Sequence, residues 1–423
     1  NLNGENWIEC QNNLGGVYSS LSLEFWFKGL NYQGGGSGKI FNINDPDILD
    51  GYIGVQISGN QLYFYVGIDD NTPGVETIED LAKTLDLSDM IGWTSKFPHA
   101  LRSALTQDLG LDIEADWSGI LCLGVGGSGA GGMLLSDISN QEGGLPFVSW
   151  KDYGLPSWWG PDWLILATSY SGNTEETLHG VTLAIQEGGT VIGISSGGKL
   201  EEILEGQESS IWINVPGGQP PRSALGHILG TQLNICWTMG LLPSVGEQEI
   251  EKMLQRFEKS SKMLDIIHGD GEIVNIAKQI HQNRIQIMAA PSLGTIGYRC
   301  RTQFNENSGI LATSSILPEL HHNEIVAWGD EQATTGVHLI IFVWNGMDER
   351  IGIRTEWTLE TLSNIPTTIL ECQGESLAEC ILHGAHMSDW LSIALALLRG
   401  KDPTSIGPIN DLKEHLSRIP LDQ

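Results

Sequence analysis

Residues 163–177 read WLILATSYSGNTEET, an apolar run that passes directly into a turn rich in hydroxyl groups. The apolar run is typical of a buried strand, and the residues from Thr174 onward have helical spacing. The turn between them carries Ser169, Ser171 and Thr174. A serine or threonine N-cap explains one hydroxyl at a helix start, but not three. Because hydroxyls and free amides at a helix N-terminus can bind a monophosphate almost without cations, we predict a phosphate site here.

An earlier glycine-rich turn also follows an apolar run, in residues 120–132 (ILCLGVGGSGAGG). Gly124 to Gly129 match G-x-G-x-x-G, which permits a dinucleotide site with Asp152 as the ribose-binding acid, or any anion site at a helix N-terminus. The hydroxyl-rich turn favours the second interpretation. Gly127 and Ser128 are therefore predicted to complete the phosphate site.

Working outward from these turns, strands alternate with helices over most of the chain, which predicts parallel, doubly wound sheets. The pattern occurs twice, so we expect an α/β protein with two tandem units and a ligand site between them. The predicted strands are residues 120–124, 145–150, 163–168, 190–195 and 210–215, then 285–290, 310–317, 337–344 and 367–371. The predicted helices are residues 174–187, 200–206, 295–305, 349–362, 386–398 and 409–416, with a long helical section at 223–282.

Residues 1–70 differ from the rest, because they show strand patterns and almost no helical spacing. SLEFWFKG at 22–29 and GYIGVQISGNQLYFYVG at 51–67 resemble part of a laminin-G or concanavalin-like jelly roll, with a hairpin around Gly59 and Asn60. Such domains need about twice this length, so we interpret the segment as a partial appendage; the alternative is a carbohydrate-binding module. Helices at 75–85 and 93–109 follow.

The expected domains are a β-rich segment at 1–70, a linker and helical lead-in at 71–118, a first αβ domain at 119–282, a second at 283–384, and C-terminal helices at 385–423. With 423 residues, the chain is long enough for several domains.

The chain has 22 Lys and Arg against 52 Asp and Glu, a formal net charge of −30. This acidity argues against a nucleic-acid binder and against an anionic membrane surface, because both partners need basic residues. The longest apolar runs are too short for a membrane helix. The six cysteines include no C-x-x-C pair, so we expect reduced, mostly buried thiols and a cytoplasmic protein with no signal peptide.

The two turns predicted to bind phosphate, residues 124–132 and 169–177, are called the phosphate turns below. Together with four later segments they carry a family resemblance. The four segments are PRSAL at 221–225, FNEN at 304–307, PELHHN at 318–323 and DLK at 411–413. The phosphate turns resemble those of sugar isomerase (SIS) domains. With the four segments, residues 80–423 resemble the archaeal-type bifunctional phosphoglucose/phosphomannose isomerases. The resemblance implies tandem SIS domains that interconvert glucose 6-phosphate and fructose 6-phosphate through a cis-enediol, in glycolysis and gluconeogenesis.

The same resemblance assigns roles to residues. Glu306 is the expected base, Arg222 stabilises the enediolate oxygen, and Lys413 opens the ring or contacts a hydroxyl. His322 opens the sugar ring and is expected to reach the active site of a partner subunit, which implies a homodimer, whereas His321 is expected to be structural. Neither a cofactor nor a metal is expected, because an enediol mechanism with a carboxylate base needs none.

One departure concerns mannose 6-phosphate. Members of the family that act on it tend to carry a threonine seven residues before the lysine, and here that position is Ile406, with Thr404 and Ser405 slightly earlier. The glucose 6-phosphate activity is thus the firmer expectation. The alternative function is a non-catalytic SIS-domain sensor of sugar phosphates, which would keep the phosphate turns but would not need Glu306, His322 and Arg222.

Overall fold

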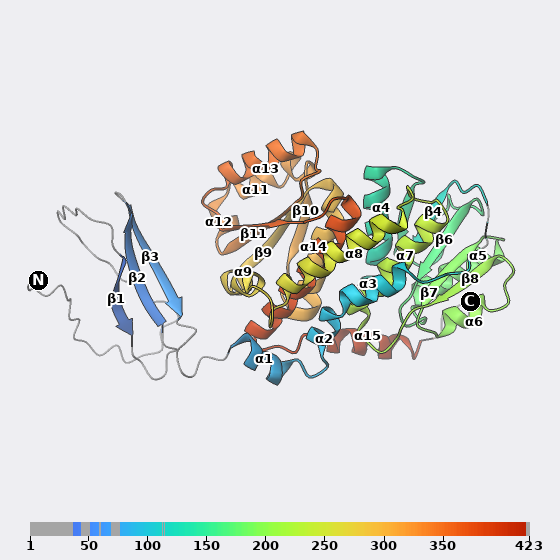
Figure 1. Ribbon diagram of the computed structural model, residues 1–423, viewed down its shortest axis with the longest axis horizontal. Coiled ribbons are helices and arrows are strands. Elements are labelled where there is room, and N and C mark those ends of the chain that lie inside the picture. Colours follow the sequence, from blue (N-terminus) through green and yellow to red (C-terminus); the bar gives the residue numbers. More distant parts are fainter. Residues whose placement is uncertain are drawn as a thin grey trace, which may run out of the picture. The chain divides into compact units, whose positions relative to one another are not determined.

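The computed structural model describes residues 37–43, 51–58, 61–68, 77–111, 113 and 115–419. The chain divides into two compact units, Asn1–Thr77 and Ile78–Gln423 (Figure 1). In the first unit an antiparallel sheet has the order β1 (Ser37–Ile43), β2 (Gly51–Ser58), β3 (Gln61–Ile68). Ser58 pairs with Gln61, which confirms the predicted hairpin. The strand expected near residues 21–27 lies outside the described residues.

The second unit contains a five-stranded parallel sheet in the order β5-β4-β6-β7-β8. All residues of β4 and β7 are buried, as expected for strands covered on both faces by helices. The strands are β4 (Gly119–Leu123), β5 (Phe147–Trp150), β6 (Trp163–Thr168), β7 (Val191–Ser195) and β8 (Ser210–Asn214), and the connecting helices are α4 (Gly126–Glu142), α5 (Glu175–Gln186) and α6 (Lys199–Leu204).

A four-stranded parallel sheet follows, in the order β10-β9-β11-β12. Its strands are β9 (Arg284–Ala289), β10 (Thr313–Ile316), β11 (Val337–Val343) and β12 (Thr367–Glu371), and its helices include α10 (Gly294–Gln303) and α13 (Glu349–Thr361). In both sheets the second strand in sequence lies at one edge, beside the first, and the third lies on the first strand's other side. The predicted pair of doubly wound sheets is confirmed, and with it the duplication of architecture.

The strand order of each sheet reverses beside its first strand, which is where ligands bind in open α/β sheets. The two places differ. After β11, Trp344 is buried, and its Nε1 donates to Ser292 Oγ, after β9, at 2.8 Å. A bonded indole therefore bridges the strand ends of the second sheet, whereas the corresponding ends of the first sheet carry the glycine-rich and hydroxyl-rich turns.

Helix α14 (Leu377–Leu398) contacts α4 of the first sheet and α10 of the second, and it runs between the two sheets in Figure 1. Among the described helices it alone is long and apolar enough to cross a membrane, but 94% of its most apolar window is buried in the protein, so it is a core helix. It begins nine residues before the predicted start at 386. Ser376 Oγ accepts from Glu379 N, and Glu379 Oε2 accepts from Glu375 N, close to a capping box that the sequence analysis missed.

The other differences lie at helix ends. The helical section predicted at 223–282 consists of three helices. The helix predicted at 93–109 consists of two helices, separated at Lys96, because the second of them has a proline in its first turn.

The five described cysteines are buried and free of disulfides. The remaining helices are α1 (Ile78–Leu85), α2 (Met90–Ser95), α3 (Phe97–Leu105), α7 (Leu225–Thr238), α8 (Glu247–Leu264), α9 (Glu272–Ile280), α11 (Ile325–Trp328), α12 (Glu331–Thr334) and α15 (Gly407–Leu416).

Candidate functional site

The two turns predicted to bind phosphate meet at the carboxyl ends of β4 and β6, where the strand order reverses. Ser128 joins them, because its Oγ accepts a hydrogen bond from Tyr170 N at 3.1 Å. Helices α4 and α5 both begin here, and neither N-cap residue, Val125 or Thr174, caps its helix with a side-chain hydrogen bond. The first amides of two helices therefore converge on one place, an arrangement that attracts an anion.

The three hydroxyls of the second turn have different surroundings. Ser169 is fully buried; its Oγ donates to Thr174 Oγ1 at 2.8 Å and accepts from Thr174 N at 3.2 Å. Because Thr174 Oγ1 accepts that bond, its own proton is left for an outside acceptor. Ser171 is exposed and Thr174 is half-buried. Ser169 thus holds the turn in shape, while Ser171 and Thr174 are placed to contact a ligand.

Gly127, in the first turn, brings the phosphate turns against the loop that carries Arg222. A Cβ at Gly127 would lie 3.1 Å from the Arg222 Cα, so glycine allows the close approach. Arg222 lies in a short 3-10 turn, Pro221–Ser223, between β8 and α7. The sequence placed these residues almost 100 positions apart, and the fold makes them neighbours.

The Arg222 side chain is 3% exposed and is held at two nitrogens. Its Nε donates to Asn307 Oδ1 at 2.5 Å, and its Nη2 donates to the Pro403 carbonyl oxygen at 2.7 Å. Its Nη1 lies 3.7 Å from Glu306 Oε2, so this nitrogen faces the predicted base. Burial lowers the pKa of the Arg222 guanidinium, and the charge of Glu306 opposes that shift. An arginine remains cationic under such a shift.

Glu306 lies in a π-helical turn, Phe304–Ser308, that ends α10. Wider turns of this kind are frequent at functional sites. The Glu306 side chain is 27% exposed, whereas the next residue, Asn307, is buried against Arg222. Glu306 is therefore a carboxylate at the edge of a buried polar cluster, with one side open to solvent.

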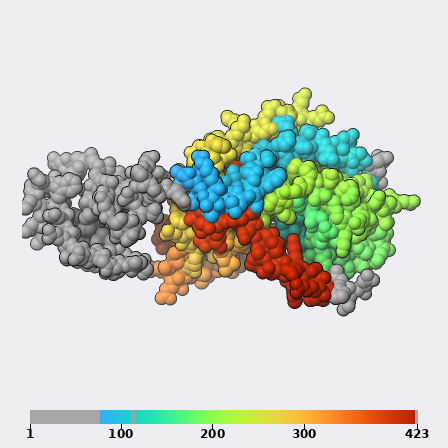
Figure 2. Space-filling model, turned by 90° about the horizontal axis from the view of Figure 1, so that it is seen from below, coloured from blue at the N-terminus to red at the C-terminus, as the bar shows by residue number. Residues whose placement is uncertain are grey.

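The other two residues with predicted catalytic roles are on the surface. His322 is exposed at the end of the 3-10 turn Glu319–His322, and no hydrogen bond or ion pair joins it to Arg222 or Glu306 within the described part of the chain. Lys413 is on α15, which has no buried residue, and Figure 2 shows the C-terminal part of the chain, in red, exposed on one face. Within one chain the fold thus brings together Arg222, Glu306 and the phosphate turns, but not His322.

His321 is bonded at both ring nitrogens, as its expected structural role requires. Nε2 is 2.8 Å from Thr358 Oγ1, and Nδ1 accepts from Arg354 Nη1 at 3.2 Å. Burial, the Arg354 charge and His322 lower the pKa of His321.

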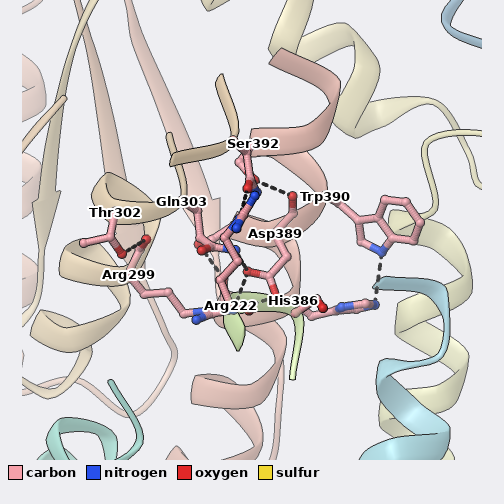
Figure 3. A network of polar contacts seen from close by, with 12 residues as sticks. Arg222, Arg299, Thr302, Gln303, His386, Asp389, Trp390 and Ser392 are labelled. Carbon is pink, nitrogen blue, oxygen red and sulfur yellow. Dashed lines mark hydrogen bonds and ion pairs between the residues drawn. The ribbon is translucent and has the colours of Figure 1, made fainter. Parts of the chain in front are cut away.

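Sequence reasoning missed the residues that surround Arg222, namely Asn307, Pro403, Arg299, Gln303, Asp389 and Ser392. Figure 3 shows Arg222 beside Asp389 of α14, with Arg299 and Gln303 approaching from α10. The available signal was a stripe of polar residues at helical spacing, His386, Asp389 and Ser392, inside a mostly apolar helix. No group of three His, Cys, Asp or Glu side chains suited to a metal ion occurs among the described residues.

The site therefore combines a place for an anion with a buried guanidinium and a partly exposed carboxylate. Residues 270–416 match the family model described as the bacterial phospho-glucose isomerase C-terminal SIS domain. Among solved structures, the C-terminal domain of glucosamine-fructose-6-phosphate aminotransferase from Francisella tularensis has the same fold, with a TM-score of 0.58 at 15% identity over 78% of this chain and 99% of that chain.

Two curated relatives are similar over most of their own length, and both are named bifunctional phosphoglucose/phosphomannose isomerase. The protein from Aquifex aeolicus is 32% identical over 74% of this chain and 94% of its own. The protein from Thermoplasma acidophilum is 32% identical over 71% of this chain and 90% of its own. The chain belongs to the bifunctional phosphoglucose/phosphomannose isomerase family.

Proposed function

We propose that this chain is an aldose–ketose isomerase that interconverts glucose 6-phosphate and fructose 6-phosphate. The observation that carries the proposal is the position of Glu306 Oε2, 3.7 Å from Nη1 of the buried Arg222, whose loop contacts the phosphate turns at Gly127. A sensor would need only the phosphate turns. A buried cation beside a partly exposed carboxylate suits a reaction in which a proton moves and negative charge develops on oxygen.

In the proposed reaction the phosphate binds at the amides of α4 and α5 and at the hydroxyls of Ser171 and Thr174. Glu306 takes the proton from C2 of the open-chain aldose and returns it to C1 of the cis-enediol, while a proton passes between O2 and O1. Arg222 Nη1 stabilises the oxygen that becomes negative. Nη1 suits this role because Nε and Nη2 already donate to Asn307 and Pro403.

We extend the proposal to mannose 6-phosphate, which differs from glucose 6-phosphate only at C2. The family name of the relatives supports this substrate. The local arrangement is compatible, because Thr404 directly follows Pro403, whose carbonyl oxygen binds Arg222, and Thr404 is half-buried there. Because Ile406 has no hydroxyl group, Thr404 is our candidate for the hydroxyl near C2.

His322 and Lys413 complete the proposal as the ring-opening groups. His322 is exposed, and no hydrogen bond or ion pair within the described residues joins it to Glu306, which supports a homodimer in which His322 of one subunit serves the site of the other. The five cysteines within the described residues are free and buried, which suits a reducing compartment, so we place the activity in the cytoplasm, as a step of glycolysis and gluconeogenesis.

The test of the chemistry is a coupled assay of fructose 6-phosphate to glucose 6-phosphate with the wild type and Glu306→Gln. We expect turnover by the wild type and a fall in kcat of about 10²- to 10⁴-fold in the variant, with retained binding of the sugar phosphate. A wild type that binds the sugar phosphate without turning it over would instead support the sensor. The same assay with mannose 6-phosphate tests the second substrate.

The shared site is tested by mixing two inactive variants, Glu306→Gln and His322→Ala, under conditions that exchange subunits. In a mixed dimer one site receives both substitutions and the other receives none. Random exchange makes half of the dimers mixed, so about a quarter of the wild-type activity should return. No recovery after proven subunit exchange would contradict a site shared in this way.

A further inference from the structure

The buried helix α14 carries two polar residues, Asp389 and Ser392, that are linked to Arg222 through residues of other elements. Asp389 accepts from Arg299 Nη2 at 2.7 Å and 2.9 Å, and from Gln303 Nε2 at 2.7 Å. Arg299 is 1% exposed and Asp389 is 3% exposed. The same Arg299 Nη2 donates to the backbone carbonyl oxygen of Arg222 at 3.0 Å. This chain of contacts links α14 to the main chain of Arg222.

A second chain of contacts links α14 to the guanidinium of Arg222. Ser392, one turn after Asp389, donates from Oγ to the Asp389 carbonyl oxygen at 2.7 Å and accepts from Asn307 Nδ2 at 2.8 Å. Asn307 Oδ1 in turn accepts from Arg222 Nε. The backbone and the side chain of Arg222 are therefore both linked to one helix. Figure 3 shows Arg222 with Asp389 and Ser392 of that helix.

Stability alone does not explain this arrangement. A buried ion pair is often no more stabilising than apolar residues of similar volume, because its charges lose their hydration. The cost is visible here, since Arg299 Nε is buried without a hydrogen-bond partner among the described residues. What the pair does achieve is geometric: one nitrogen, Arg299 Nη2, donates both to the Asp389 carboxylate and to the Arg222 carbonyl oxygen, and so ties the two residues together.

We propose that Asp389, acting through Arg299, is a positioning residue that holds Arg222 with Nη1 toward Glu306 and the reacting end of the sugar. The inference rests on the proposed isomerase function. Helix α14 suits the task because it contacts both α10, which carries Arg299, and the π-helical turn that carries Glu306. One buried helix thus sets the position of the guanidinium relative to the base.

The first test is Asp389→Asn, which keeps the shape of the side chain and removes its charge. We expect kcat to fall by about 10- to 100-fold, because a small displacement of Arg222 removes charge stabilisation in the transition state. KM should change less than about threefold, because the phosphate turns keep their own contacts. Ser388→Ala is the matched control: Ser388 is equally buried on α14, and its Oγ donates to the Gly384 carbonyl oxygen of the same helix. Its kcat should not change.

A double-mutant cycle distinguishes positioning from a general structural effect. If Asp389 acts through Arg222, then Asp389→Asn should cost little further activity in an Arg222→Lys background. If Asp389→Asn lowered activity by the same factor in the wild type and in Arg222→Lys, the proposal would be overturned. Should Asp389→Asn fail to fold, Gln303→Leu replaces it, since this change removes only the single bond from Gln303 Nε2 to Asp389.

A readout independent of turnover separates this inference from the proposed function. The Nε–H of Arg222 donates to the buried Asn307, so its hydrogen exchange, followed by NMR of ¹⁵N-arginine-labelled protein, should be slow in the wild type. We expect exchange at least about tenfold faster in Asp389→Asn and unchanged in Ser388→Ala. An unchanged rate in Asp389→Asn would overturn the positioning role even in an active enzyme, and a faster rate would support it even if another reaction is catalysed.

Discussion

His386 lies in the middle of α14 with its imidazole fully buried. The ring packs against Phe97 and Phe257, and its Nε2 is 2.7 Å from Ser261 Oγ and accepts from Trp390 Nε1 at 3.0 Å. Burial lowers the pKa of His386 to about 3, and His383 and Arg299 act in the same direction. The folded protein therefore keeps this residue neutral at pH values where the unfolded chain is protonated.

This difference predicts acid sensitivity. Because the folded-state pKa of His386 is below the unfolded value near 6.5, protonation of this residue favours the unfolded chain. The contribution of His386 to the free energy of unfolding is therefore fully present above pH 6.5 and is lost as the pH falls toward 3. The loss from His386 between pH 6.5 and pH 4 is about 3 kcal/mol. In urea unfolding at a series of pH values, His386→Gln should reduce this dependence without abolishing it, because burial also lowers the pKa of His383, to about 4. An unchanged dependence would mean that His386 does not cause it.

Among single residues, the sequence could predict those whose role depends only on their neighbours along the chain. Ser171, Thr174 and Gly127 follow from turns that adjoin their own strands. Asp389 and Arg299 could not be found in this way, because each becomes meaningful only when α10 and α14 pack together and place both beside Arg222.

Among the elements, the phosphate turn after β6 depends on one glycine. Gly172 has φ +67°, and a Cβ there would lie 1.7 Å from the Gly197 carbonyl oxygen, in the loop after β7. Gly172→Ala should therefore displace the turn and raise KM for the sugar phosphate by about tenfold or more, because the amides no longer converge. The measurement is the coupled assay over a range of substrate concentrations.

Gly188→Ala is the matched control for this prediction. Gly188 also has a positive φ, +80°, but nothing lies within 4 Å of a Cβ at that position. Its substitution should cost about 1 kcal/mol of stability from backbone strain and leave KM unchanged. If both variants raised KM equally, the contact with Gly197 would not be what shapes the turn.

The elements also show what sequence patterns can and cannot predict. The buried strands were recognisable because parallel strands covered on both faces are continuous apolar runs. The π-helical turn at Phe304–Ser308 was not, because its extra width depends on Asn307 and Ser308 bonding to α14 rather than on local propensity. The break between α2 and α3 had a local signal, Pro98, which helical spacing alone obscured.

For the whole molecule, the main asymmetry is that two sheets of the same strand order differ at the ends where that order reverses. In the first sheet these ends carry the glycine-rich and hydroxyl-rich turns, at which α4 and α5 begin. In the second, Trp344 and Ser292 bond across the corresponding ends. The second αβ unit instead supplies Glu306 and Asn307 to Arg222, which belongs to the first. In the proposed reaction the two halves therefore have different tasks: the first binds the phosphate, and the second supplies the base.

This division predicts that residues 78–423 suffice for activity. Both parallel sheets and all residues placed in the site belong to the unit Ile78–Gln423, and Asn1–Thr77 forms a separate compact unit. A variant that lacks residues 1–77 should keep kcat within about twofold and the thermal midpoint within about 3 °C, as expected for a unit with its own core. The coupled assay and thermal unfolding measure both quantities. A variant that ends at Gly400 is the matched truncation: it loses Lys413 and the Pro403 carbonyl oxygen that binds Arg222 Nη2, so its kcat should fall at least about tenfold. Loss of folding in the first variant would show instead that the segment before Ile78 is part of the isomerase.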